Sequence, residues 1–185
     1  MHLNILIKHG MSLGLAILLV APSTVYSDVR AKLNGYQEGP SVSTDATGSF
    51  RAKLRRGASE ISYKLSYSGI ETFVRFAHIH FAERHVNGAI IVWLCDNTGN
   101  SPIVVQPCPQ GGGTVEDVIT PDSVSGASTQ GIDVGEFDEL IEAINAKATY
   151  INVHSDAVPS GEIRGQIRGK LRGRDNDEED SDDDD

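Results

Sequence analysis

The sequence has few of the residues on which most enzyme and nucleic-acid sites are built. Cysteine and methionine occur twice each, tryptophan once, and aromatic residues make up 6% of the chain. The two cysteines do not form a CxxC motif, and neither a nucleophile elbow nor a phosphate-binding glycine loop is present. No basic patch with interleaved aromatic residues appears in the sequence, which disfavours nucleic acid as a partner. These absences favour a binding role over an enzymatic one.

Long apolar runs are also scarce, and the first of them lies near the N-terminus. Lys8 precedes an apolar run from Leu13 to Val20, and Val25-Tyr26-Ser27 fits the small-x-small rule for cleavage. We expect residues 1–27 to be a secretory signal peptide, either cleaved or retained as an anchor. After cleavage no membrane span is expected. The predicted localisation is secreted, periplasmic or cell envelope.

The acidity of the chain is concentrated at its other end. The net charge is −10, and the tail from Asp175 onward carries nine acidic residues and no basic one. Without this tail and the signal segment, residues 28–174 carry a net charge of −2. A run of like charges cannot pack into a core, so we expect residues 173–185 to be a disordered acidic tail. Such a tail solubilises the chain or attracts cations and basic surfaces.

The cysteines are interpreted in the light of export. Cys95 and Cys108 lie thirteen positions apart, and in an oxidising compartment an isolated pair is most simply a disulfide. A loop of that size would stabilise the fold by roughly 3 kcal/mol. The alternative, a thiolate metal site or redox pair, lacks both the usual spacing and a neighbouring histidine.

Period-two alternation runs through most of the remaining chain. It recurs in segments such as EISYKLSYSG, VRFAHIHF and ATYINVH, which Gly, Asn, Ser and Asp residues separate. This pattern predicts one all-β domain over residues 28–172, an antiparallel, Greek-key-like β-sandwich. Residues 135–147 have instead the spacing of an amphipathic helix, with apolar residues at Phe137, Leu140, Ile141 and Ile144. We expect this helix to cross one open end of the sandwich.

Three histidines are the main candidates for a functional site. His78 and His80 stand two residues apart in a predicted strand and therefore project from the same face. His154 lies in a second such strand, and if the two strands are neighbours the three imidazoles could bind copper or zinc. Glu162 and Arg164 are candidate outer-shell residues of this site, and Glu162 would fix the tautomer of His154. The alternative is that the histidines are merely solvated or hydrogen-bonded structural residues.

Four segments together resemble a known family. LNGYQEGPSVSTDATGSFRAKL, FAHIHFAERHVNGAIIVWLC, GEFDELIEAINAKATYINVHS and PSGEIRGQI are similar, in this order, to the CHRD (chordin-type) domain. The resemblance covers roughly residues 30 to 169. It implies a β-sandwich in an extracellular or periplasmic setting, with a biochemical role that is mostly unassigned. We expect the partner to be an extracellular protein or a surface polymer that the sequence does not identify. Growth-factor antagonism is not implied, because chordin's cysteine-rich modules are missing.

A looser resemblance concerns the metal. A His-x-His strand followed by a disulfide and a late Val-His strand is similar to Cu/Zn superoxide dismutase. The resemblance implies His78, His80 and His154 as copper ligands, His85 as the candidate for a fourth, and Arg164 as a substrate-guiding residue. The histidine and aspartate cluster of a zinc site is missing. The sequence thus predicts a non-enzymatic exported binding module with a histidine metal site, and the alternative is a copper or zinc protein with dismutase-like redox activity.

Overall fold

The computed structural model describes residues 26–55 and 59–172. The predicted acidic tail and all but the last two residues of the predicted signal peptide lie outside this part of the chain. The described strands are β1 (Tyr26–Asn34), β2 (Thr47–Arg55), β3 (Ile61–Ser68), β4 (Val74–Phe81), β5 (Ala89–Asp96), β6 (Gly112–Ile119), β7 (Thr149–Ser155), β8 (Ile163–Gln166) and β9 (Arg168–Gly169). One α-helix, α1 (Phe137–Asn145), and three 3-10 turns complete them: η1 (Gly35–Gln37), η2 (Pro121–Ser123) and η3 (Ser128–Gln130). None of the described helices is long and apolar enough to cross a membrane.

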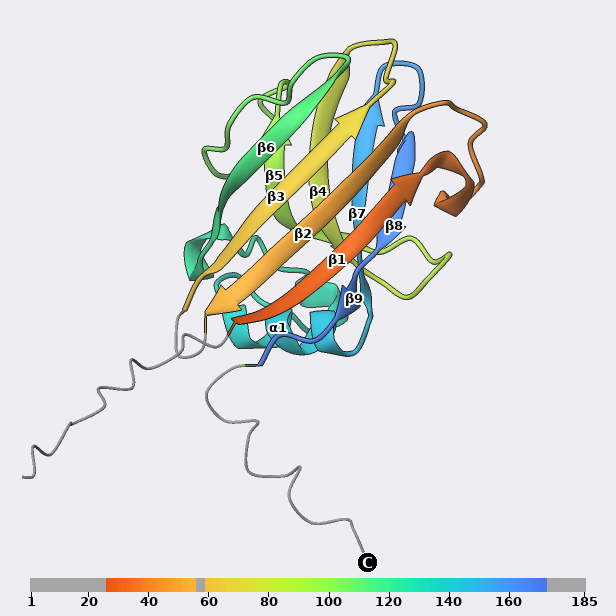
Figure 1. Cartoon of the computed structure of the whole chain (residues 1–185). Coiled ribbons are helices and arrows are strands. Elements are labelled where there is room, and N and C mark those ends of the chain that lie inside the picture. The colour runs from red at the N-terminus through yellow and green to blue at the C-terminus, as the bar shows by residue number, and fades with distance from the viewer. Residues whose placement is uncertain (1–25, 56–58, 173–185) are drawn as a thin grey trace, which may run out of the picture.

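The strands form one antiparallel sheet that folds over into two layers. Its order is β5-β4-β7-β8-β1-β2-β3-β6, with β9 paired to β1. In Figure 1, β6, β3, β2 and β1 form the front layer, while β5, β4, β7 and β8 lie behind them. The predicted all-β sandwich is thereby confirmed. The nearest neighbours of β4 are β5 and β7, so the two histidine-bearing strands lie side by side.

The two layers differ in how their outer faces are covered. Along β3, buried apolar residues alternate with exposed polar ones, as expected for a strand with one face on the core and one in water. All seven residues of β7 are buried. Its inward residues Ile151 and Val153 belong to the apolar core. Its outward residues Tyr150 and His154 are hydrogen-bonded to the loop backbone at Gly88 and Pro159. The outer face of the rear layer is therefore a second, polar interior.

The edges of the sheet are joined across the sandwich. A disulfide links Cys95 at the end of β5 to Cys108 in the loop before β6, with 5.1 Å between the Cα atoms, which confirms the predicted bridge. The Tyr63 hydroxyl donates a hydrogen bond to the Leu94 carbonyl over 2.9 Å. At one end of the sandwich lies α1, with its predicted apolar stripe buried. The predicted helix is therefore present, two residues shorter at each end than expected.

Candidate metal centre

The pairing of β4 with β7 brings the three predicted histidines together. His78 lies opposite Asn152, and Phe76 lies opposite His154, so all these side chains project from the outer face of the rear layer. One ring nitrogen from each of His78, His80 and His154 lies within 4.8 Å of the other two. The three side chains are 1%, 8% and 7% exposed. The three histidines are thus not merely solvated, and their cluster could hold a metal ion.

Two backbone carbonyls fix how two of these rings are oriented. His80 Nδ1 lies 2.9 Å from the Gly88 carbonyl oxygen, and His154 Nδ1 lies 2.9 Å from that of Pro159. A carbonyl oxygen can only accept, so both Nδ1 atoms carry the proton. Each ring then presents an unprotonated Nε2, the form in which imidazole binds a metal.

The other ring nitrogens of the three histidines have few hydrogen-bond partners. His78 Nδ1 lies 3.2 Å from His80 Nε2, a separation at which one proton bridges the two rings. His78 Nε2 and His154 Nε2 are buried and have no hydrogen-bond partner among the described residues. A buried polar atom without a partner destabilises the protein by about 1–3 kcal/mol. The cluster therefore has unused ligand capacity, which fits a bound cation.

The electrostatic environment keeps the rings neutral. Burial is the largest influence, and it lowers the pKa of His80 and of His154 to about 4. The carbonyl hydrogen bonds oppose this effect, while Arg164 near His80 and Arg75 near His154 add to it. Burial, reinforced by the other two rings, lowers the pKa of His78 further still. At neutral pH none of the three rings needs to lose a proton from an imidazolium before it binds a metal.

Aromatic rings enclose the cluster. Phe76 lies 4.8 Å from both His78 and His154, measured between ring centroids. Trp93 of β5 meets the His78 ring edge-on at 4.5 Å, and it is the only tryptophan in the chain. These walls lower the local dielectric and place an intrinsic fluorophore against a candidate ligand.

Arg164 supports the cluster from the far side of Tyr150. Tyr150 lies on β7, between β4, which carries His80, and β8, which carries Arg164. Its ring stacks on that of His80 with 4.7 Å between the ring centroids and an interplanar angle of 1°. The Arg164 guanidinium lies 3.4 Å from the centroid of the same ring. It also donates hydrogen bonds to the carbonyls of Glu83 and Val86 over 3.0 and 2.9 Å. Arg164 therefore anchors the loop after β4 and does not face the histidine nitrogens as a substrate-guiding residue would.

A buried carboxyl group next to the cluster has no counterpart in the sequence-based prediction. Glu38, from the loop after η1, accepts a hydrogen bond from Asn152 Nδ2 over 2.6 Å. Burial raises the pKa of Glu38 to about 7, although Arg164 and the Asn152 hydrogen bond oppose the shift. Gly161 makes room for this pair, because a Cβ there would lie 2.6 Å from the Asn152 amide and 2.9 Å from Glu38 Oε1. The alternation of β7 places Asn152 on the histidine face, but a loop glutamate gives no such signal.

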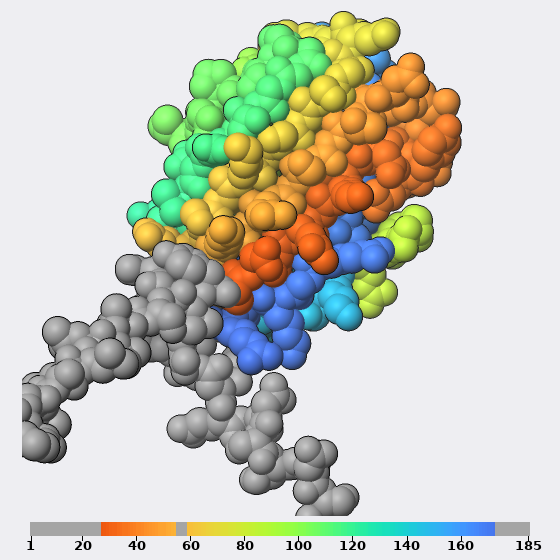
Figure 2. All heavy atoms as spheres, viewed as in Figure 1, coloured from red at the N-terminus to blue at the C-terminus, as the bar shows by residue number. Residues whose placement is uncertain are grey.

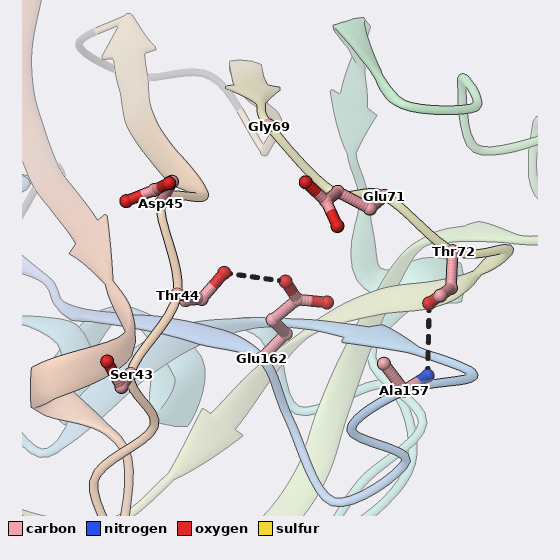
Figure 3. A pocket seen from close by; sticks show the side chains of 8 residues that line it. All are labelled: Ser43, Thr44, Asp45, Gly69, Glu71, Thr72, Ala157 and Glu162. Carbon is pink, nitrogen blue, oxygen red and sulfur yellow. Dashed lines mark hydrogen bonds between the residues drawn. The ribbon is translucent and has the colours of Figure 1, made fainter.

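The structure does not place Glu162 against His154. The Glu162 carboxylate accepts hydrogen bonds from the hydroxyl groups of Ser155 and, over 2.8 Å, Thr44. Ser155 follows His154 in β7 and points to the opposite face, so Glu162 lies away from the histidines. It lines a pocket of about 340 Å³. Asp45 and Glu71 line the same pocket, as Figure 3 shows. The Pro159 carbonyl holds the tautomer of His154 instead.

His85 is also separate from the cluster. It lies in the loop after β4 with a φ of 65° and an exposed side chain. Among the described residues, the group that could hold a metal contains His78, His80 and His154 alone. The loop that carries His85 contributes through its backbone, since it ends at the Gly88 carbonyl that orients His80.

Comparison with known proteins gives one match. The family model of the CHRD domain matches residues 29–167, which include the disulfide and all three clustered histidines. No significant match was found among curated proteins or among solved structures.

Proposed function

The chain belongs to the CHRD domain family, and from the geometry of its histidine cluster we propose that it is an exported, non-enzymatic protein that binds one copper ion. The observation that carries this proposal is the convergence of three buried, neutral imidazoles. Two of them have their Nδ1 protons held by carbonyls, and the buried Nε2 atoms of His78 and His154 have no hydrogen-bond partner among the described residues. His78, His80 and His154 would hold the ion through neutral imidazole nitrogens.

The ligand set favours copper over other divalent ions. Neutral imidazole suits copper, zinc, nickel and iron, and copper binds most tightly in the general affinity order of such sites. Magnesium and calcium require oxygen ligands, and the described histidine cluster includes no carboxylate. Zinc is the main competitor, because three histidines and a water molecule also form a zinc site.

The surroundings favour the reduced copper ion. The rings of Phe76, Trp93 and Tyr150 enclose the site, and its three histidine ligands carry no negative charge. The cost of removing an ion from water rises with the square of its charge, so for ions of equal size Cu⁺ costs about a quarter as much as a divalent ion. We therefore expect Cu⁺ to bind more tightly than Zn²⁺, with Cu²⁺ held by the same atoms.

The remainder of the chain supports export. The Cys95–Cys108 disulfide suits an oxidising compartment, and the N-terminal sequence has the pattern of a signal peptide. Sequencing the N-terminus of the protein recovered outside the cytoplasm should give Asp28 as the first residue. Recovery of the full chain in the cytoplasm would contradict export without affecting the metal site.

Dismutase-like redox activity is the second candidate. The pattern of His78 and His80 followed much later by His154 resembles the copper ligand set of Cu/Zn superoxide dismutase. This activity fits the site less well. Superoxide needs an open, cationic approach to the metal, whereas Arg164 is held by Tyr150 and by loop carbonyls. Superoxide consumption by the copper-loaded protein that disappears in His78→Ala would establish the enzyme. No consumption beyond that of the metal-free protein is the expected result.

Trp93 offers a direct test of binding. Metal-free protein would be titrated with Cu²⁺, Zn²⁺ and, under anaerobic conditions, Cu⁺ in competition with a Cu⁺ chelator. Because Trp93 touches the His78 ring, binding should change its emission with a one-to-one endpoint, and the paramagnetic Cu²⁺ should quench it most strongly. His78→Ala/His80→Ala should abolish the response, whereas His85→Ala, which removes an exposed histidine, should not alter it. An equal response in both variants would refute the proposed site.

A further inference from the structure

The outer face of the front layer carries a row of positive charges. Arg168 of β9 pairs with Arg30 of β1, Arg30 lies opposite Arg51 of β2, and Arg51 lies opposite Lys64 of β3. Directly opposed residues on neighbouring strands have Cβ atoms about 5 Å apart, and like charges at such positions are destabilising. Four cations thus stand side by side across four strands. The row ends at Glu116 of β6, opposite Lys64.

Few anions offset this charge within the described residues. Lys32 and Lys53 extend the row on both sides, and all six cationic side chains are exposed. Of the six, Lys64 alone has an ion-pair partner among the described residues, Glu116 at 2.5 Å. Asp28, opposite Lys53, is the one acidic residue on the outward side of these four strands. We define this surface, made of Arg30, Lys32, Arg51, Lys53, Lys64 and Arg168, as the basic face. Figure 2 views the molecule from the side of the layer that carries it.

The chemistry of the basic face limits what can bind it. The other outward residues near its centre are hydroxyl-bearing, among them Ser49, Ser62 and Ser66. Within residues 27–34, 47–54 and 61–68, the outward side of β1, β2 and β3 has no aromatic side chain on which a nucleic-acid base could stack. A flat cationic surface of this kind attracts a flexible anionic chain through charge alone.

The chain contains such an anionic segment a few residues after β9 in the sequence. Residues 175–185 carry nine acidic residues, and they begin six residues after Gly169, which pairs with Val29 of β1. Thirteen residues beyond Arg172 can extend by at most about 45 Å. The distance from β9 to β3 across the sheet is about 14 Å, from the usual spacing of strands. The tail can therefore reach every cation of the basic face, at the millimolar effective concentration that a short tether provides.

We propose that the acidic tail, residues 175–185, binds the basic face of its own domain and keeps other polyanions away from it. This contact neutralises the opposed arginines and is independent of the copper site. It is electrostatic and lies in solvent, so it is sensitive to salt: screening shortens the reach of a charge to about 3 Å at 1 M ionic strength. Loss of the tail, or high salt, would expose a surface for anionic polymers.

Carbodiimide crosslinking of the full chain tests where the tail lies. The reagent joins a tail carboxylate to a lysine amine as an amide and takes up the water that is lost. In the monomer, crosslinks from the tail to Lys53 and Lys64 should exceed those to Lys147 several-fold, and 1 M NaCl should remove the difference. Lys147 is an exposed lysine at the α1 end of the domain, so a tail that samples all directions would reach it as well. Equal crosslinking of the three lysines, or crosslinks only between isotopically distinct copies, would overturn the proposal.

Binding to a dextran sulfate column tests the consequence. The protein truncated after Gly173 should elute at higher salt than the full chain. In the truncated protein, Arg30→Gln/Arg51→Gln should reverse this shift. The matched pair Arg84→Gln/Lys147→Gln removes two exposed charges outside the basic face and should leave most of the shift in place. Equal effects of the two pairs would show that net charge alone governs retention and would refute a specific basic face.

Discussion

Burial of the histidines should make copper binding unusually resistant to acid. Protons compete with the metal for each imidazole, so apparent affinity falls once the pH drops below the pKa of the ligands. Three solvated imidazoles, each with a pKa near 6.5, would lose about 10⁴-fold in affinity between pH 7.5 and pH 5. In this protein the pKa of both His80 and His154 is lowered to about 4. The same change in pH should therefore weaken binding by less than about twofold.

Equilibrium dialysis against a chelator of known proton affinity would measure this dependence. A short peptide with three exposed histidines, dialysed in the same buffers, provides the reference for the solvated case. A loss of affinity centred near pH 6 would refute the argument that burial sets the pKa of the ligands. The expected loss begins only as the pH approaches 4.

The domain must remain folded for this comparison to be valid. Unfolding exposes the histidines and raises their pKa from about 4 to about 6.5, so the unfolded chain takes up more protons. The free energy of unfolding therefore decreases as the pH falls from 6.5 towards 4, by about 2 kcal/mol at pH 5 for each of His80 and His154. The circular dichroism spectrum should be recorded at every pH, and only points with native signal should be used.

Three further changes separate the copper site from its support. Gly88→Ala places a Cβ 1.8 Å from the Phe81 carbonyl oxygen, so the loop must shift, and we expect copper affinity to fall about 10–100-fold in the same dialysis assay. Arg164→Lys removes the planar group stacked on a tyrosine ring and should lower the unfolding free energy in urea by about 2 kcal/mol or more, since the ammonium cannot replace that stacking; unchanged stability would contradict this role. Cys95→Ser/Cys108→Ser should lower the free energy of unfolding in urea by roughly 3 kcal/mol and leave the copper affinity within twofold of the unmodified protein. A large loss of copper affinity would show that the disulfide positions the site.

Regular strand patterns account for what the sequence predicts well. The alternation in FAHIHF and YINVH places the histidines on one face of each strand, and the pairing of β4 with β7 then brings the two strands together. The amphipathic stripe of α1 and the isolated cysteine pair are local signals of the same kind. Each depends on spacing within one segment or on a count of residues, so the surrounding fold is not needed to infer it.

The supporting residues depend on contacts between distant loops. Gly88 and Pro159 act through backbone carbonyls, which no side-chain pattern marks. Glu38 becomes buried because its loop folds over Asn152, more than a hundred residues away. Glu162 has the parity of a residue on the histidine face, yet it precedes the first residue of β8 and turns towards Thr44. Side chains alternate between the two faces of the sheet within a paired strand, but this alternation no longer predicts their direction beyond the end of the strand.

Metal content measured by mass spectrometry is the most direct test of the copper site. The protein should be purified without an affinity tag and truncated after Gly173, because the nine acidic residues of the tail would bind cations of their own. We expect close to one copper ion per chain after loading, and none in His78→Ala/His80→Ala prepared in parallel. Absence of metal from both proteins after incubation with copper, or equal amounts in both, would contradict the site.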